Sequence, residues 1–219
     1  MMETLEEIYG EGCWMLKVIP SDIMRLPFLR ILKLTGTCDL NFQMLPQTSV
    51  ATGSKVIDLS YCKMLKELPE LSTFLSFDKL ILKGCEMLTK LSESVGMFKY
   101  LVELDVSFTS IVELPNSIVN LKSLKVLKIG GSCMQKLPDA IVMMGKLEEI
   151  YGEDCQMLEV ISSDIMRLPF LRILKLTGTC DMNIPKLPHS WVSISILTCF
   201  RKRFGDLQFI KSKNVKLCF

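Results

Sequence analysis

Apolar residues recur along the chain with one fixed spacing. From a first apolar position, usually leucine, further mostly apolar residues follow three and five places later, and Cys, Thr or Ser follows at place eight. Eight such units start at residues 5, 29, 54, 77, 101, 124, 147 and 171. Because alternate residues of a strand point to opposite sides, places three and five face inward and places two, four and six face outward. The pattern predicts one short, half-buried strand in each unit.

The intervals between these units, 24, 25, 23, 24, 23, 23 and 24 residues, predict a stacked repeat architecture. One unit of this length cannot bury its apolar edge alone, so neighbours stack around a continuous core. The consensus LxxLxLxx(N/C/T)xxLxxLP is typical of leucine-rich repeats and extends over residues 5–199, where a degraded ninth unit reads Trp191, Ile194, Ile196 and Cys199. We expect an α/β fold, a leucine-rich-repeat solenoid (horseshoe) with a parallel concave sheet and short helical turns on the convex side.

The second half of each unit predicts those helical turns. In segments such as "LPNSIVNLKSL", a side chain with a capping oxygen precedes apolar residues at helical spacing. The expected capping residues are Ser21, Asp22, Ser92, Asn116, Asp139, Ser163 and Asp164. Prolines end the coils, where a fixed φ does little harm, at Pro46, Pro69, Pro115, Pro138 and Pro188. The outer side is therefore expected to carry helical turns rather than a second sheet.

One stretch of the chain occurs twice. Residues 5–46 and 147–188 differ at only 8 of 42 positions, at a constant offset of 142 residues, which equals six units. The duplicated passage is thus two neighbouring units copied further along one solenoid. Duplication without a second binding site is the simpler interpretation, and two like binding sites are the alternative.

Composition and charge narrow the class of protein. The chain is 49% hydrophobic and 23% charged, so it can bury a continuous core, and its net charge of +2 gives no reason to expect nucleic acid or a membrane as partner. Nine cysteines form no CxxC pair, and the start is acidic, so we expect a reducing compartment, the cytoplasm or the nucleus.

Residues 1–200 are expected to form the repeat domain of eight to nine units. Residues 201–219 form a basic tail of net charge +5, interpreted as a solvated end or, alternatively, a localisation signal or docking patch.

The cysteines follow the repeat rather than a metal site. Cysteine stands at place eight at Cys13, Cys62, Cys85, Cys155 and Cys199, and at place nine at Cys38, Cys133 and Cys180. A polar side chain at place eight bonds the backbone near the turn that leaves each strand, so a ladder of structural donors is expected. The lone His189 has no partner at metal spacing, and "GGSC" at 130–133 lacks the frame of a phosphate loop. We expect no catalytic site, cofactor or metal, and therefore no enzyme.

The outward places of the strands remain as the candidate site. The middle column, place four, reads Tyr9, Lys33, Asp58, Ile81, Asp105, Lys128, Tyr151 and Lys175. Lys33 beside Asp58 and Asp105 beside Lys128 are interpreted either as cross-strand charge pairs or as parts of a binding surface. Nine strands spaced by about 4.8 Å give a face about 40 Å long, which suits a protein partner better than a small molecule.

Several phrases resemble one family in particular. "SKVIDLSYCKMLKELPEL", "LVELDVSFTSIVELPNSIVNLKSL" and "RLPFLRILKLTGT" resemble the repeat region of plant intracellular disease resistance proteins of the TIR, nucleotide-binding and leucine-rich-repeat class, in their flax rust-resistance branch. The resemblance implies recognition of a pathogen effector or a guarded host protein, and an intramolecular contact with a nucleotide-binding domain that this sequence lacks. We accordingly expect a fragment or truncated homologue of such a receptor.

Two alternatives stay open. The "LPxxIxxLxxL" return half is also similar to that of Ras-group leucine-rich-repeat scaffolds, which favour Asn at the ladder position where this chain has Cys or Thr. A decayed gene product without a binding role is the third interpretation.

Overall fold

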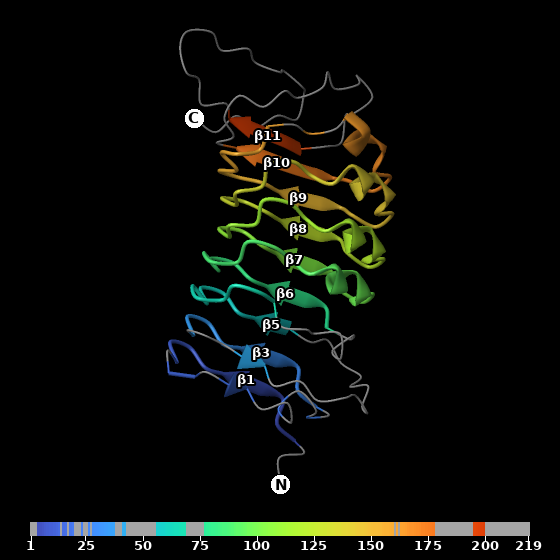
Figure 1. Ribbon diagram of the computed structural model, residues 1–219. Coiled ribbons are helices and arrows are strands. Elements are labelled where there is room, and N and C mark those ends of the chain that lie inside the picture. Colours follow the sequence, from blue (N-terminus) through green and yellow to red (C-terminus); the bar gives the residue numbers. More distant parts are fainter. Residues whose placement is uncertain are drawn as a thin grey trace.

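The protein is a stack of coils that each contribute one strand to a common sheet (Figure 1). The structure is a computed structural model of the chain. It describes residues 4–13, 15–16, 18–19, 23, 26, 28–37, 41–42, 56–68, 77–159, 161, 163–177 and 195–199. In Figure 1 the coils follow one another in chain order from the N-terminus to the C-terminus, and the stack curves little in this view. The predicted solenoid is confirmed. The tail at 201–219 lies outside the described residues, as do Cys38, Cys180, His189, the capping residues Ser21 and Asp22, and Pro46, Pro69 and Pro188.

One parallel sheet runs along the stack. Its nine strands in the described residues follow the order β1-β3-β5-β6-β7-β8-β9-β10-β11. They are β1 (Glu7–Tyr9), β3 (Ile31–Lys33), β5 (Val56–Asp58), β6 (Lys79–Ile81), β7 (Glu103–Asp105), β8 (Val126–Lys128), β9 (Glu149–Tyr151), β10 (Ile173–Thr177) and β11 (Ser195–Cys199). Each unit contributes one strand at the predicted places, and the strand of the degraded ninth unit pairs with β10, Ile196 opposite Leu174.

The core lies behind the sheet and is continuous from coil to coil. The strand residues at place three, such as Leu80, Leu104 and Leu127, have no exposed surface. Residues of the return halves close the coil from the other side, as where the rings of Phe77 and Phe98 lie 4.7 Å apart. Because each layer packs on its neighbours, burial in one unit depends on the next, as the stacked-repeat prediction requires.

Short 3₁₀ helices form the convex side of the later coils, at the right of Figure 1. They are η1 (Glu93–Met97), η2 (Asn116–Asn120), η3 (Asp139–Met143) and η4 (Ser163–Arg167). Ser92 caps η1 as predicted, because its side chain accepts a hydrogen bond from Ser94 N. The prediction that Asn116 and Asp139 are N-caps was wrong, because each is the first residue of its helix. The N-cap positions are held by Pro115 and Pro138, which make no capping side-chain hydrogen bond.

The first two coils differ from this arrangement. Their return halves pair as a small parallel sheet of β2 (Val18–Ile19) and β4 (Asn41–Phe42), with Val18 opposite Asn41. A second, two-stranded sheet does form there, which the prediction excluded, whereas Ile23 of the first return segment is helical and its neighbours 20–22 and 24–25 lie outside the described residues.

Place seven of each unit has a left-handed backbone. Its φ lies between 56° and 73° in the seven units whose place seven is described, at Gly12, Gly36, Tyr61, Gly84, Phe108, Gly131 and Asp154. Glycine adopts this conformation without steric cost, whereas Tyr61 and Phe108 do not. Each of these two rings covers the glycine of the next coil, because a Cβ added at Gly84 or Gly131 would lie 2.5 Å or 2.4 Å from the ring.

Replacing Gly131 with alanine should lower the free energy of unfolding by about 1–2 kcal/mol, because the new Cβ meets a left-handed φ and displaces the Phe108 ring. Urea unfolding followed by circular dichroism measures the change. Gly145→Ala is the matched control, since an added Cβ there meets nothing within 4 Å. It should leave stability unchanged or raise it by up to about 1 kcal/mol. Equal losses in both variants would contradict the assigned turn.

Candidate protein-binding face

The outward side of the sheet, called here the concave face, presents its residues in two regular rows. The register aligns the predicted place-four residues opposite one another from strand to strand. The row reads Tyr9, Lys33, Asp58, Ile81, Asp105, Lys128, Tyr151 and Lys175. The place-two row beside it reads Glu7, Ile31, Val56, Lys79, Glu103, Val126, Glu149 and Ile173. The structure thus brings all eight candidate residues together, and their role in binding stays a prediction.

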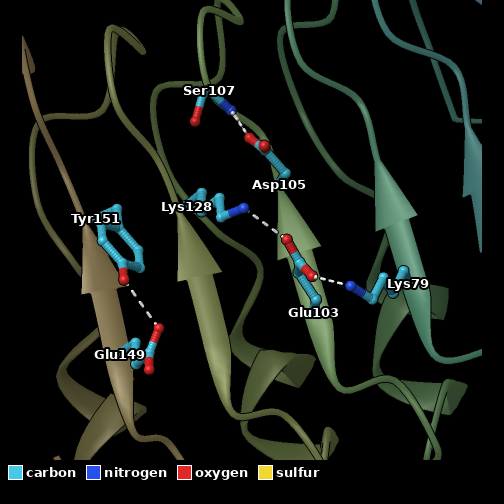
Figure 2. Close-up of polar contacts among 7 residues, drawn as sticks. All are labelled: Lys79, Glu103, Asp105, Ser107, Lys128, Glu149 and Tyr151. Carbon is cyan, nitrogen blue, oxygen red and sulfur yellow. Dashed lines mark hydrogen bonds and ion pairs between the residues drawn. The ribbon is translucent and has the colours of Figure 1, made fainter. Parts of the chain in front are cut away.

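A glutamate on β7 ties three strands together at the centre of this face (Figure 2). The Glu103 carboxylate lies 2.8 Å from Lys79 Nζ on β6 and 2.6 Å from Lys128 Nζ on β8. Its side chain is only 13% exposed, against 47% and 36% for the two lysines. Glu103 therefore joins the two rows through charge-assisted hydrogen bonds that solvent screens only in part.

The titration of this cluster reflects the balance of burial and pairing. Burial raises the pKa of the Glu103 carboxyl, but the hydrogen bonds from Lys128 and Lys79 outweigh it and leave the pKa below its ordinary value. Burial likewise lowers the pKa of Lys128, and the bond to Glu103 outweighs it and leaves the pKa above its ordinary value. Glu103 and Lys128 are therefore both charged near neutral pH, which makes Glu103 a structural clamp rather than a proton donor.

The expected charge pairs form with other partners. Lys33 Nζ lies 3.2 Å from Glu11 Oε1, and Lys128 Nζ bonds Glu103, so neither lysine pairs with the aspartate opposite it. Asp105 accepts a hydrogen bond from Ser107 N at 2.9 Å instead, as Figure 2 shows, and Asp58 accepts one from Ser60 N at the same distance. The two aspartates fasten the backbone where each strand ends, a local role typical of aspartate.

The two tyrosines of the row bond to neighbouring glutamates. Tyr9 Oη donates to Glu7 Oε2 and Tyr151 Oη donates to Glu149 Oε2, both at 2.9 Å. The hydrogen bond to Glu7 raises the pKa of Tyr9, and burial with the bond to Glu149 raises that of Tyr151. Tyr9 remains 57% exposed, so its ring is available to a partner.

The buried thiols form the predicted ladder. Cys62 Sγ donates to Leu34 O at 3.1 Å, and Cys85 and Cys155 make the same bond to the preceding coil, at 3.2 Å and 3.0 Å. Thr109 Oγ1 instead donates to Val106 O of its own coil. Burial raises the pKa of Cys85 to about 12 and also raises those of Cys62 and Cys155, so these thiols stay protonated and join neighbouring coils.

The described part of the chain was searched for a metal site and for a membrane-spanning helix. Within it, no three His, Cys, Asp or Glu side chains gather where they could hold a metal ion. Among these same residues, no helix has the length and apolar character to cross a bilayer. "GGSC" at 130–133 follows β8 as a turn whose Gly131 is packed against Phe108, which is a structural role.

The Glu103 clamp is the residue that sequence reasoning missed. The signal was present in the place-two column, where Lys79 precedes Glu103 on the adjacent strand. Lys128 stands in the other column, at place four, and its contact with Glu103 is diagonal. Finding this contact requires the place-two and place-four columns to be compared with each other.

Comparison with known proteins agrees with this architecture. The profile of the protein family described as a leucine-rich repeat region matches residues 41–159, more than half of the chain. A search of curated proteins gives no match.

Solved structures share the fold. A leucine-rich repeat protein of Leptospira interrogans is 25% identical, with a TM-score of 0.54, and the match covers 83% of this chain and 50% of that one. The functional domain of InlJ from Listeria monocytogenes, described as including a cysteine ladder, is 16% identical at a TM-score of 0.54, covering 90% and 42%. The Arabidopsis receptor kinase HAESA, in complex with the peptide hormone IDA and the co-receptor SERK1, is 18% identical at 0.58, covering 90% and 34%. The chain spans half or less of the length of each of these proteins.

Proposed function

The chain belongs to the leucine-rich repeat family, and from that premise we propose that it is a protein-recognition module whose partner binds the concave face. The uninterrupted sheet, with its ordered rows of tyrosine and charged side chains, carries this proposal. Leucine-rich repeat domains generally bind protein partners, and the fold is typically a non-enzymatic scaffold. The complex of HAESA with a peptide hormone and a co-receptor is an example of such binding in that protein.

The more specific proposal is a role in plant innate immunity. In it the chain is the sensing part of a cytoplasmic resistance protein of the TIR, nucleotide-binding and leucine-rich-repeat class, and it binds a pathogen effector or a guarded host protein. The phrases "LVELDVSFTSIVELPNSIVNLKSL" and "RLPFLRILKLTGT" support it by their resemblance to that class. An immunoblot of source tissue with an antibody against the repeats tests it. A band far larger than 24.9 kDa is expected, and a band at 24.9 kDa would contradict the receptor role.

Replacing Tyr9, Tyr151 and Lys175 together with alanine should reduce partner capture at least tenfold, because the three side chains supply aromatic area and charge at the proposed interface. Capture from extracts of pathogen-challenged plant tissue is compared between wild type and variant by quantitative mass spectrometry. Circular dichroism should be unchanged, because all three side chains lie on the sheet surface.

The matched control is a triple variant on the convex side. Tyr100, Met97 and Met143 are 62%, 47% and 70% exposed, and their replacement with alanine should leave capture unchanged. Capture that survives the concave variant but is lost in the convex one would sink the proposal.

A Ras-group-like intracellular scaffold remains the second candidate. The "LPNSIVNLKSL" return half favours it, and the Cys and Thr ladder opposes it. Capture of signalling proteins in unchallenged tissue, without gain after pathogen challenge, would favour the scaffold over the immune role.

A further inference from the structure

Two exposed aromatic residues follow the strands at the same place of the repeat. Tyr61 comes after β5 and Phe108 after β7, both at place seven, and they are 50% and 49% exposed. Their φ angles, 60° and 56°, lie in the left-handed region, which is unfavourable for residues with a Cβ and exceptional for bulky ones. Such strain is typical of functional sites, so these two residues call for an explanation.

The turn at place seven does not require these rings. Glycine makes the same turn in four of the described units. At two of these, Gly12 and Gly36, no ring atom lies within 4 Å of an added Cβ. A bare glycine is therefore sufficient for the turn, and the side chains of Tyr61 and Phe108 add exposed apolar surface that the turn does not need.

Translation along the stack relates one ring to the other. Tyr61 N donates to Lys83 O at 2.6 Å and Phe108 N donates to Gly130 O at 2.7 Å, so the two residues hold equivalent places in the backbone ladder. Each ring also lies against the glycine of the next coil through the same three atoms, Cδ1, Cε1 and Cγ. Because β5 and β7 are two strand steps apart, equivalent atoms of the two rings lie about 9.6 Å apart.

A lysine from the intervening coil adds a positive charge to this pair of rings. Lys83 Nζ lies 5.7 Å from the centre of the Phe108 ring, which is a cation–π contact. Among the residues that the structure describes, no carboxylate pairs with Lys83 and no acceptor takes a hydrogen bond from its ammonium group. An ammonium group has three N–H donors, and the contact with the ring leaves them available to a ligand.

The spacing of the rings matches the repeat of a polyproline II helix. Such a helix has three residues per turn and rises about 3.1 Å per residue, so prolines three residues apart lie on one side about 9.3 Å apart. Side chains on one side recur about every 6.6 Å along an extended strand and about every 5.4 Å along an α-helix, and neither distance nor its double comes as close to the ring spacing. Proline-rich segments in the polyproline II conformation dock on aromatic side chains in several recognition domains.

We propose that Tyr61, Lys83 and Phe108 bind a polyproline II segment of a protein partner that runs along the stack. Two prolines three residues apart pack on the two rings, and an acidic side chain between them pairs with the Lys83 ammonium group. The segment loses little conformational entropy on binding, because it already has the bound conformation. The site lies beyond the strand ends, outside the two rows of the concave face, so it adds a second contact surface to the proposed function.

Short rhodamine-labelled peptides test the ligand. The probe has two prolines three residues apart with a glutamate between them. In the first comparison peptide, of the same composition, the prolines are four residues apart and lie on different sides of the helix. In the second comparison peptide, lysine replaces the glutamate. Fluorescence polarisation measures the Kd of each for the full chain. The probe should bind at least about fivefold more tightly than either, because only its second proline and its carboxylate make intramolecular second contacts.

Glycine variants remove a ring without straining the turn. Tyr61→Gly and Phe108→Gly each introduce the residue that stands at place seven in four other units, so both should fold, as circular dichroism checks. Each should weaken binding of the probe to the level of the peptide with the four-residue spacing. Lys83→Gln should remove the preference for glutamate over lysine and keep the preference for the three-residue spacing. Tyr100→Ala, at a tyrosine on the convex side that is 62% exposed, is the control and should retain both preferences.

Two results with the wild-type chain would overturn the inference, whether or not the glycine variants fold. Equal Kd values for the three- and four-residue spacings, or no binding of any peptide, would refute the polyproline II ligand. Binding of the lysine peptide as tightly as the glutamate peptide would refute the acidic contact with Lys83. Neither result bears on the concave face, whose role in recognition is tested by partner capture with the triple alanine variant of that face.

Discussion

Replacing Leu104 with alanine should lower the free energy of unfolding by about 3 kcal/mol. Leu104 has no exposed surface, lies in the central strand β7, and faces Leu80 and Leu127 on the adjacent strands. Its removal leaves a cavity that rigid strands on both sides cannot fill, so the loss exceeds the transfer free energy of the side chain.

Urea unfolding followed by circular dichroism measures this loss. Because repeats depend on their neighbours, a defect in the middle coil should also weaken the cooperativity of the transition, seen as a smaller m-value. Val112→Ala is the control, since Val112 is 40% exposed and its truncation should change stability by less than about 0.5 kcal/mol. Equal effects of the two truncations would contradict a core shared between neighbouring coils.

Replacing Glu103 with glutamine should lower the free energy of unfolding by about 2 kcal/mol near neutral pH. The amide removes the charge between Lys79 and Lys128 and leaves two ammonium groups facing each other across β7. This loss is smaller than that expected from breaking a fully buried ion pair, because both lysines are more than a third exposed and solvent screens their charges. Glu67→Gln is the control, because Glu67 and Lys90 form an exposed pair at 4.0 Å that should contribute less than about 0.5 kcal/mol.

The same variant should change how stability depends on pH. The folded-state pKa of Glu103 is lowered, so its contribution is present above the unfolded-state pKa and is lost as pH falls through the folded-state value. The folded-state pKa of Lys128 is raised, so its contribution is present below the unfolded-state pKa and is lost as pH rises through the folded-state value. The stability difference between wild type and Glu103→Gln should therefore be flat from about pH 5 to 10 and shrink on both sides. A difference that grows in acid would contradict the assigned clamp.

The strands were predictable because burial dictates them. Places three and five must be apolar in every coil, so the sequence repeats its requirement and the register follows, as the alignment of Leu80, Leu104 and Leu127 shows. The thiol ladder was predictable for the same reason, since place eight meets the same backbone in each unit. The spacing did not predict which carbonyl each side chain bonds: Cys62 bonds the preceding coil, whereas Thr109 bonds its own.

The spacing of the repeat did not predict the partner of Lys128 or the N-cap of η2. Lys128 lies opposite Asp105 but bonds Glu103, while Asp105 accepts a hydrogen bond from Ser107. The N-cap of η2 is Pro115, at the end of a coil, and not the polar residue Asn116 that follows it. Such choices rest on small energy differences among flexible side chains, which spacing alone does not encode.

Photo-crosslinking from the middle of the concave row tests the recognition proposal most directly. Ile81 lies in β6 at the centre of that row, and Met143 lies in η3 on the convex side with 70% of its surface exposed. Each is replaced in turn by p-benzoylphenylalanine, and the protein is irradiated in extracts of pathogen-challenged plant tissue. The account predicts a discrete crosslinked protein from position 81 and none from position 143. Crosslinking from position 143 alone would contradict it.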